Sequence, residues 1–592
     1  MDAQNGFIIE AKDLTKNFKQ EDGTVVTAFS ALDLKVQTGR LTALIGPDGA
    51  GKTTLIRLIA GLMLPTAGTL TVMGKNVAEE PQAVQDELSY MPQKFGLYED
   101  LSVEENMNLY ADLHGIPQDI RPGRFGRLLK MTGLEPFTKR LAGKLSGGMK
   151  QKLGLACTLV RSPSLLLLDE PTVGVDPLSR RELWEILQKL IKTDPISIFV
   201  STAYMDEAEM CADVIVFNHG RILAHGTPAS IRALAKNRCF SVHPPAELPT
   251  RVLQSLLLDD TAHIVDAVPD GGRVHFIRRD TEDSPILSEH GITATPVPER
   301  LEDGFMLLLH RDMENNSETD DISVSPAENS ALKEHTFIRS REALPVDIEV
   351  KNLVRKFGDF TAVANTSFAV HQGEVFGLLG PNGAGKTTTF RMLCGLLPAT
   401  GGYLNVAGVD LSVSRTKARA NIGYVAQKFS LYGNLTVLEN LHFFGGAYGL
   451  YGNKLKERID AVLDEFSLRG RENDAADELP GGYKQRLSMA AALMHEPKIL
   501  FLDEPTSGID PLARRLFWRQ ITDLSARGTT IIITTHFMEE AEYCDRIMIQ
   551  DQGKLLAIGS PENIRKELGL SDASMNEVFI TIVENGRKEE KA

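Results

Sequence analysis

The sequence has few cysteines, and their pattern excludes a disulfide scaffold. Cys157, Cys211, Cys239, Cys394 and Cys544 are an odd number, and they lie far apart in mostly apolar or helical surroundings. A secreted disulfide framework would need an even set at short spacings. We therefore predict reduced, buried thiols.

Long apolar runs and an excess of positive charge are also missing. No stretch of 18 or more apolar residues occurs, and the start MDAQNGFIIE lacks the charged-then-apolar build of a signal peptide. Asp and Glu number 79 against 64 Lys and Arg, so the net charge of −15 argues against a nucleic-acid partner. We expect a cytoplasmic protein that binds no nucleic acid.

A long internal repeat is the main feature that the chain does contain. GPDGAGKTT at 46–54 returns as GPNGAGKTT at 380–388, a step of 334 residues, and the step is still 333 between Ser201 and Thr534. A period this long indicates two whole domains fused in tandem. At roughly 150 residues per domain the length allows about four compact units, enough for two domains that each have a sheet part and a helical part.

Each half has the pattern of an α/β domain. The apolar segments 41–46 and 374–380 predict strands that turn through glycines into helices. The apolar runs 165–171 and 500–505 end in acid and predict central strands of a mostly parallel sheet. About 100 residues of mainly helical pattern separate each glycine-rich loop from the strand that ends in acid. We therefore predict a helical subdomain inserted in an α/β core.

The halves diverge after the first domain. The pattern there predicts a strand, a helix and a hairpin that turns at 270–272, which together indicate a small α+β extension. Seven acids and three bases among Asn, Ser and Pro at 313–345 predict a flexible linker. For the extension we favour an asymmetric spacer over a ligand-binding regulator. The predicted domains are 1–237, 238–312, 313–345 and 346–592.

The two glycine-rich loops predict ATP binding. Loops of this spacing close backbone N–H groups around the phosphates, aided by the positive end of the next helix. Lys52 and Lys386 would neutralise phosphate charge, and the first threonine of each loop would ligate Mg²⁺. The predicted loop residues are Gly46, Pro47, Asp48, Gly49, Ala50, Gly51, Lys52, Thr53 and Thr54, and Gly380, Pro381, Asn382, Gly383, Ala384, Gly385, Lys386, Thr387 and Thr388.

The acids after the central strands predict hydrolysis. Asp169 and Asp503 end the strands and are predicted partners of Mg²⁺. Glu170 and Glu504 follow them and are placed to orient and polarise an attacking water, which is worth roughly 10² to 10⁴ in rate. Two phosphate loops, each followed at the same spacing by an apolar strand ending in Asp-Glu-Pro, make a chance match in an unrelated fold very improbable.

Further motifs resemble the ATPase subunits of ABC transporters. They are LSGGMKQK at 145–152, the turns GVDP and GIDP, and TTHFMEEAE at 534–542, and the resemblance covers nearly all of 8–230 and 348–583. The wording KFxLYxxLTVxEN and the endings EDGFMLLL and NEVFITIV look most like ABC-2-type exporters, including subunits with two fused ATPase domains. The resemblance implies two RecA-like P-loop ABC domains in tandem.

The family resemblance also assigns roles to residues outside the phosphate loops. Gln93 and Gln427 would touch Mg²⁺ and relay motion to a membrane partner. Phe18 and Phe357 would stack on adenine, and Asp176 and Asp510 would make contact across the domain interface. The signature sequence would consist of Ser146, Gly147 and Gly148 in the first half and Gly481 and Gly482 in the second. From the residues alone, the two phenylalanines could equally be core aromatics of an edge strand, and the two aspartates could only shape a turn.

A pair of arginines follows each GxDP turn, in a segment with a helical pattern that also contains Glu or Trp. For these residues we predict a solvated helix face rather than a site. They are Arg180, Arg181, Arg514 and Arg515.

Two departures from the family pattern predict unequal ATP sites. Ala203 stands where the second half has His536, so no imidazole can hold the γ-phosphate or the water there. Pro480 stands where the first half has Ser146, which removes a hydroxyl and a backbone donor. In a head-to-tail pair both losses fall on the composite site of Lys52 and Glu170. We predict one competent site, with Glu504 and His536 as catalytic residues, and one degenerate site.

The favoured function is an ATPase subunit that powers membrane permeases, two in number and alike or different, on the cytoplasmic face of the inner membrane. Further envelope components are possible partners, and the cargo would not touch this chain. This chain would dock on the permeases through grooves near residues 93–106 and 427–440. Two alternatives are a tandem ABC factor acting on ribosomes, against which the acidic linker and broken signature argue, and a sugar-importer ATPase, against which the GxDP turns argue.

Overall fold

The first phosphate loop follows a central strand of an α/β sheet. In the computed structural model, β3 (Leu41–Ile45) is parallel to β8 (Ser197–Ser201) on one side and to β9 (Asp213–Asn218) on the other. Every β3 residue is buried, as a strand covered on both faces must be. The loop therefore emerges at the carboxyl edge of the sheet, where α1 (Lys52–Ile59) begins.

The structure describes residues 6–19, 24–93, 96–245, 248–280, 282–315, 344–507, 509–570 and 573–589. It divides into two units, Met1–Asn237 with Pro298–Asp321, and Arg238–Val297 with Ile322–Ala592. Most of the predicted linker at 313–345 lies outside the described residues.

In the first unit the larger sheet has the order β10-β9-β3-β8-β7-β6, and a second, antiparallel sheet has the order β2-β1-β4-β5. The further strands are β1 (Phe7–Lys19), β2 (Val25–Gln37), β4 (Ala67–Val72), β5 (Lys75–Asn76), β6 (Leu88–Met91), β7 (Leu165–Asp169) and β10 (Arg221–Gly226). The further helices are α2 (Pro81–Gln85), α3 (Val103–Leu113), α4 (Arg121–Thr132), α5 (Gly147–Leu159), α6 (Pro177–Thr193), α7 (Met205–Glu209), α8 (Pro228–Arg232) and α11 (Leu301–Asn315).

The second unit repeats both sheets, with the orders β24-β23-β17-β22-β21-β20 and β16-β15-β18-β19. Its strands are β15 (Val346–Phe357), β16 (Phe360–His371), β17 (Val375–Leu379), β18 (Gly401–Val406), β19 (Val409–Asp410), β20 (Ile422–Val425), β21 (Ile499–Asp503), β22 (Thr530–Thr534), β23 (Arg546–Asp551) and β24 (Lys554–Gly559). Its helices are α13 (Lys386–Leu393), α14 (Arg415–Arg419), α15 (Val437–Ala447), α16 (Gly452–Glu465), α17 (Gly481–Ala492), α18 (Pro511–Ala526), the 3₁₀ helix η5 (Met538–Tyr543), α19 (Pro561–Glu567) and α20 (Met575–Glu589).

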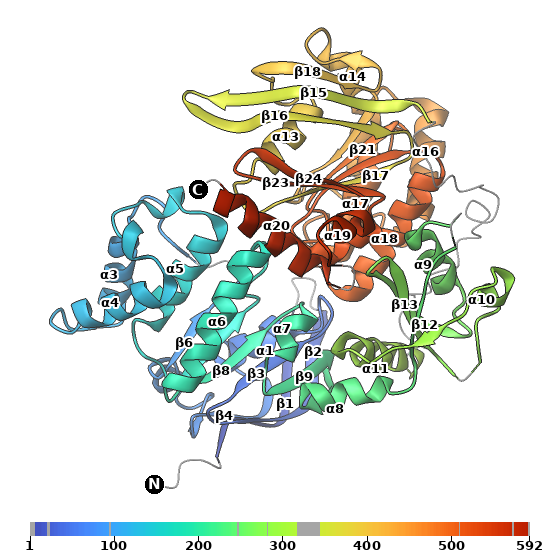
Figure 1. The fold of residues 1–592 in the computed structure, drawn as a ribbon. Coiled ribbons are helices and arrows are strands. Elements are labelled where there is room, and N and C mark those ends of the chain that lie inside the picture. The colour runs from blue at the N-terminus through green and yellow to red at the C-terminus, as the bar shows by residue number, and fades with distance from the viewer. Residues whose placement is uncertain are drawn as a thin grey trace. The chain divides into compact units, whose positions relative to one another are not determined.

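A helical subdomain is inserted in each unit, as predicted. In the first unit α3, α4 and α5, light blue in Figure 1, lie together beside the sheet that carries β3. A capping box starts α3, because Ser102 accepts from the Glu105 backbone and the Glu105 carboxylate accepts from the Ser102 backbone. The corresponding helix α15 starts with the same box, built from Thr436 and Glu439.

The apolar core of each unit lies on its phosphate-loop helix. In the first unit Ile9 and Leu70 of the antiparallel sheet, Leu55 of α1 and Phe199 of the larger sheet belong to one buried cluster. The second unit has an equivalent cluster around Phe390 of α13. Packing on both faces of this helix holds the loop rigidly against the sheet.

Residues 238–297, here called the insert, form a small sheet and helices within the second unit. The strand order is β12-β13-β11-β14, with β11 (Cys239–Val242), β12 (Ile264–Asp270), β13 (Arg273–Arg278) and β14 (Thr295–Pro296), and the helices are α9 (Thr250–Asp259) and α10 (Pro285–Glu289). The predicted strand, helix and hairpin are therefore confirmed. Gly271 and Gly272 form the hairpin turn with φ of 62° and 75°, values that favour glycine.

The helix that follows the insert belongs to the first unit. There α11 packs on α8, and a Cβ on Gly304 would lie 2.1 Å from the Ile231 carbonyl oxygen, so only glycine permits this close approach. Asp303 accepts from the backbone N–H of Arg300 at 2.7 Å and fixes the start of the helix. Residues 301–312 of the predicted extension thus lie in α11.

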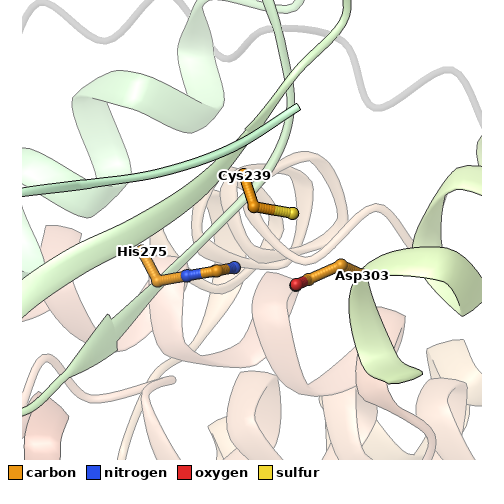
Figure 2. Close-up of side chains that lie close together, drawn as sticks. All are labelled: Cys239, His275 and Asp303. Atoms are coloured by element: carbon orange, nitrogen blue, oxygen red, sulfur yellow. The ribbon is translucent and has the colours of Figure 1, made fainter. Parts of the chain in front are cut away.

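All the cysteines are free and buried, which confirms the predicted reduced thiols. Cys239 begins β11 of the insert, and His275 lies on the neighbouring strand β13 (Figure 2). Burial raises the pKa of the Cys157 and Cys211 thiols well above the ordinary value, so neither is a reactive thiolate. Among the described helices, none has the length and apolar character needed to cross a bilayer.

Candidate active sites

The first phosphate loop is built around a close backbone approach. A Cβ on Gly46 would lie 1.9 Å from the Phe217 carbonyl oxygen, so a side chain cannot be placed there. The Lys52 ammonium donates to the carbonyl oxygens of Gly46 and Pro47 at 2.8 and 2.9 Å. The loop therefore curls around its own lysine, and Gly51 caps α1 with φ of 102°.

The second loop repeats this arrangement. A Cβ on Gly380 would lie 2.2 Å from the Gln550 carbonyl oxygen, and Gly385 caps α13 with φ of 100°. Lys386 donates to the carbonyl oxygens of Gly380 and Pro381. Both lysines are buried, so each loop holds a positive charge in a position to meet phosphate.

In the first unit the acid strand meets the loop directly. Asp169 Oδ1 accepts from Thr53 Oγ1 at 3.3 Å and from Ser201 Oγ at 2.7 Å. Tyr90 OH donates to the other carboxylate oxygen at 3.4 Å. A hydroxyl and a carboxylate are thus brought together, and these are oxygen donors of the kind that Mg²⁺ prefers.

In the second unit Asp503 occupies the corresponding position. Its Oδ1 accepts from Thr534 Oγ1 at 2.6 Å. Burial is the main cause that raises the pKa of the Asp503 carboxyl, with the neighbouring Glu504 charge acting in the same direction. A cation bound beside Asp503 would relieve this penalty.

The predicted catalytic glutamates adopt the same unusual backbone conformation in both units. Glu170 has φ of 48° and Glu504 has φ of 46°, in the left-handed region that non-glycine residues seldom occupy. Gln93 Nε2 donates to Glu170 Oε2 at 2.7 Å, and Gln427 Nε2 donates to Glu504 Oε2 at 2.6 Å. Strain of this kind is concentrated at functional sites.

The two glutamates differ in charge environment. Burial raises the pKa of the Glu170 carboxyl, and Lys52, 4.0 Å away, offsets the effect only in part. Burial acts on Glu504 in the same direction, but His536, Lys386 and Gln427 outweigh it and lower its pKa. Glu504 is therefore the glutamate more firmly held as a carboxylate, which is the form a general base needs.

His536 explains much of this difference. It is 4% exposed, and its Nδ1 lies 3.1 Å from Glu504 Oε2. That approach is too poorly directed to be a hydrogen bond, and both ring nitrogens are buried without a hydrogen-bond partner among the described residues. The first unit has the buried Ala203 at this position, so it has no such ring.

The signature helices begin differently in the two units. Ser146 caps α5 by accepting from the Met149 backbone N–H at 3.3 Å. Pro480 caps α17 and makes no side-chain hydrogen bond there. Because Ser146 and Pro480 are both exposed, the difference lies on a surface that another molecule or domain can reach.

Phe18 and Phe357 lie near the ends of the paired strands β1 and β15. Phe357 is 46% exposed and Phe18 is half-buried, so neither is a buried core aromatic. Lys16 lies over the Phe18 ring at 5.1 Å, and Arg355 lies over the Phe357 ring at 4.4 Å. Adenine stacking by these rings stays a prediction.

Asp176 and Asp510 cap the helices that follow the GxDP turns. Asp176 accepts from the Ser179 backbone N–H at 3.1 Å, and Asp510 accepts from that of Ala513 at 2.9 Å. The turn-shaping role is therefore real in both units. The interface role stays a prediction.

The predicted solvated helix face is wrong for the second unit. Arg514 and Arg515 are 5% and 6% exposed. Arg514 lies near the carboxylates of Glu539 and Glu540, and Arg515 lies 3.3 Å from Asp266 of the insert. The prediction failed because the partners lie elsewhere in the sequence. In the first unit Arg181 is exposed as predicted, but Arg180 is partly buried and pairs with Asp206 at 3.1 Å.

Sequence reasoning also missed two hydroxyls that fix the glutamates. Ser201 Oγ accepts from the Glu170 backbone N–H at 3.0 Å, and Thr534 Oγ1 accepts from that of Glu504 at 3.0 Å. Each hydroxyl also donates to the preceding aspartate. The only sequence signal is that Ser201 and Thr534 fall at equivalent places in the repeat.

Phosphate loops, acid strands and strained glutamates, arranged alike in both units, define a class: this is an ATPase of the P-loop type with two nucleotide sites. The ABC transporter family profile matches residues 29–173 and 363–507. The chain belongs to the ABC transporter ATP-binding family, and it is an ATP-binding, ATP-hydrolysing transporter subunit with two ATPase domains in tandem.

Named relatives cover the chain to different extents. The chain is 46% identical over 594 residues to the probable multidrug ABC transporter ATP-binding protein YbhF of Escherichia coli (strain K12), and the match covers 99% of each chain. Linearmycin resistance ATP-binding protein LnrL of Bacillus subtilis (strain 168) is 41% identical over 243 residues, 40% of this chain and 78% of its own. Nod factor export ATP-binding protein I of Rhizobium sp. (strain N33) is 45% identical over 223 residues, 38% and 73% respectively.

Proposed function

We propose that this chain energises an ABC-2-type membrane exporter for drug or other small-molecule efflux. The observation that carries the proposal is the likeness to YbhF, which extends over both ATPase domains and the insert. The names of LnrL and the Nod factor protein, which refer to resistance and export, support the same direction. The permeases would bind the cargo, and this chain would not.

ATP with Mg²⁺ fits the residues present. Each buried lysine is placed to neutralise phosphate, and the orphaned Nε2 of His536 offers a group for a γ-phosphate oxygen. The Mg²⁺ would supply charge stabilisation for the transferred phosphoryl group. The residues that would hold it are Thr53, Gln93 and Asp169 in the first domain, and Thr387, Gln427 and Asp503 in the second.

At the second site the chain's own residues suit water attack on the γ-phosphate. Glu504 would accept the proton of the attacking water, and Gln427 and His536, which flank its carboxylate, would hold it in position. Lys386 would stabilise charge on the phosphate oxygens. The lowered pKa of Glu504 keeps it ready as a base at neutral pH.

The two sites are proposed to be unequal. In the ATP-bound state each signature would complete the site of the other domain, so Ser146 would serve the site with Glu504 and His536. The site with Glu170 and Ala203 would receive the Pro480 signature. Loss of γ-phosphate donors in a dry site costs roughly 10² or more in rate. The weaker site would mainly bind ATP and hold the domains closed.

Exposed apolar side chains near the predicted grooves support docking to permeases. Tyr432 and Phe443, each 47% exposed, lie with ring centroids 4.8 Å apart on the helical subdomain that follows Gln427. In the first unit Tyr98 is 57% exposed after Gln93. Exposed aromatics gathered in this way mark protein interfaces. We infer that permease contacts reach Glu170 and Glu504 through the glutamines.

Isolation from membranes tests the proposed assembly at the cytoplasmic face. The chain would be tagged, membranes solubilised gently, and co-purifying proteins identified with their stoichiometry. Two permease subunits per chain, with or without further envelope components, is the expected result. Recovery with ribosomes, or without any membrane protein, would overturn the exporter proposal and leave only the ATPase.

Turnover of glutamine variants tests the inequality of the sites. Glu504→Gln should abolish most ATP hydrolysis, whereas Glu170→Gln should leave most of it intact. ATP binding measured in parallel keeps lost chemistry distinct from lost affinity. If Glu170→Gln removed turnover and Glu504→Gln did not, the assignment would be reversed.

A further inference from the structure

A buried arginine of the insert forms polar contacts with the ATPase domain of the second unit. Arg251 is 3% exposed and lies near the start of α9. Its guanidinium pairs with the Asp545 carboxylate and donates to Ser525 Oγ at 2.9 Å. Asp545 in turn accepts from the Val375 backbone N–H at 2.9 Å, so the contact reaches the strand that leads into the phosphate loop.

Two further ion pairs join the insert to α18, which lies beside α9 in Figure 1. Asp266 of β12 is 5% exposed and lies 3.3 Å from Arg515 Nε. Asp259 at the end of α9 pairs with Arg519, one helical turn further along α18. The Asp266–Arg515 pair is buried, so loss of either partner leaves an uncompensated charge, and the Asp259–Arg519 pair is partly buried.

The elements that the insert contacts lie next to residues of the second ATP site. Helix α18 starts at its cap Asp510, and η5 starts two residues after His536. Arg514, next to Arg515, lies 3.9 Å from Glu540 of η5, and the Glu540 carboxylate accepts from Thr535 Oγ1 at 2.6 Å. A continuous set of contacts therefore runs from the insert to the residue that precedes His536.

The docking chemistry is specific to the second domain. The first domain has the same fold, yet it differs at the positions that receive α9. Arg519, Ser525 and Asp545 correspond to Glu185, Ile191 and Ala212. An ATPase domain does not need these charges in order to fold, since the first domain lacks them. They therefore serve the insert.

The insert and the ATPase domain also meet at η5, where the Gly272 backbone N–H donates to a Glu542 carboxylate oxygen at 3.4 Å. A cavity of about 1130 Å³ lies between them within the second unit, lined by His243 and Arg273 of the insert and by Glu374 and Glu542 of the domain. The polar contacts on α18 and η5 therefore hold the insert beside a face that is only partly filled.

We infer that the insert is a positioning clamp for the second ATP site: by holding α18 and the segment after His536, it fixes Asp510 and His536 for hydrolysis. This inference rests on the proposed function of that site. Asp259 and Arg519 act as positioning residues and touch no substrate. Displacement of a catalytic group by about 1 Å can cost roughly 10² in rate.

Charge reversal on α18 tests the clamp. Arg519→Asp places a carboxylate against Asp259 and near Asp523, which interacts electrostatically with Arg519. We expect kcat to fall about tenfold or more while the Kd for ATP changes less than about twofold.

Rescue and a matched control make the result specific. The double variant Asp259→Arg with Arg519→Asp restores an oppositely charged pair and should recover kcat to within about twofold. Glu185→Arg is the same kind of reversal at the equivalent exposed position of α6, and it should leave turnover unchanged. Full turnover in Arg519→Asp, or failure of the double variant to recover it, would overturn the inference.

Hydrogen exchange of the intact protein without nucleotide gives a readout separate from activity. Amides of 538–545 should exchange faster in Arg519→Asp than in the parent or in Glu185→Arg. If this change appears but the parent hydrolyses no ATP through Glu504, the proposed function has failed and the clamp has not. If exchange is unchanged, the clamp itself is refuted.

Discussion

At the scale of single residues, the two active sites differ most in what surrounds the glutamate. Glu170 and Glu504 share a left-handed φ, a glutamine partner and a hydroxyl on the backbone N–H. Only Glu504 has an imidazole 3.1 Å away. The same backbone thus carries two carboxyls whose pKa values move in opposite directions.

We expect His536→Ala to raise the pKa of Glu504, because the imidazole is the largest of the groups that lower it. A base with a higher pKa is protonated at higher pH, so the acid limb of the kcat profile should move to higher pH as overall turnover falls by roughly 10². Measurement of kcat between pH 5 and 9 checks this. An unmoved limb would contradict it.

The reverse change offers a matched test in the first domain. Ala203→His should lower the pKa of Glu170 by adding a ring where His536 stands in the repeat. In a Glu504→Gln background, which silences the second site, the residual turnover should rise and extend to lower pH. No gain in residual rate would show that the Pro480 signature alone limits the site.

At the scale of helices and strands, local signals were sufficient for most elements. The apolar runs 41–46, 374–380 and 165–171 became buried strands, and the glycine pair at 271–272 became a hairpin turn, because their patterns are local. The burial of Arg515 could not be predicted, since Asp266, its partner, lies 249 residues away in the sequence. The left-handed φ of Glu504 could not be predicted either, because the backbone N–H of this residue is held by the hydroxyl of Thr534, 30 residues further along the chain.

The signature caps supply a pair of stability changes with opposite signs. Ser146→Ala removes the side-chain cap of α5 and should lower the free energy of unfolding of the first unit by about 1 kcal/mol. Pro480→Ser adds a cap to α17 and should raise that of the second unit by a similar amount. Denaturant titrations measure both, and Ser146→Asp, which keeps a capping oxygen, should be nearly neutral.

At the scale of the whole molecule, two units with separate cores should unfold separately. Calorimetry should show two transitions, and saturating ATP should raise both, by about 2.7 kcal/mol of stability at 100 times Kd. Lys52→Ala should remove the ATP effect from one transition and Lys386→Ala from the other. A single transition that either variant affects equally would contradict independent units.

The partition of the chain also determines what a truncation can do. The insert precedes the second ATPase domain in sequence and shares its unit. A fragment 344–592 should therefore be less stable than 238–592, because Arg515 would lose its buried partner Asp266, at a cost of about 3–5 kcal/mol, and Arg519 would lose Asp259. Thermal unfolding of both fragments checks this, and equal midpoints would contradict it.

An ion pair at the base of each larger sheet has the opposite sign in the two units. Arg40 pairs with Asp213 at 3.0 Å in the first, and Glu374, 1% exposed, pairs with Arg546 at 3.3 Å in the second. Tandem repeats risk misassembly in which a strand of one copy inserts into the other. Here such an exchange would set arginine against arginine and glutamate against aspartate, so each phosphate-loop strand is directed to its own sheet while the chain folds.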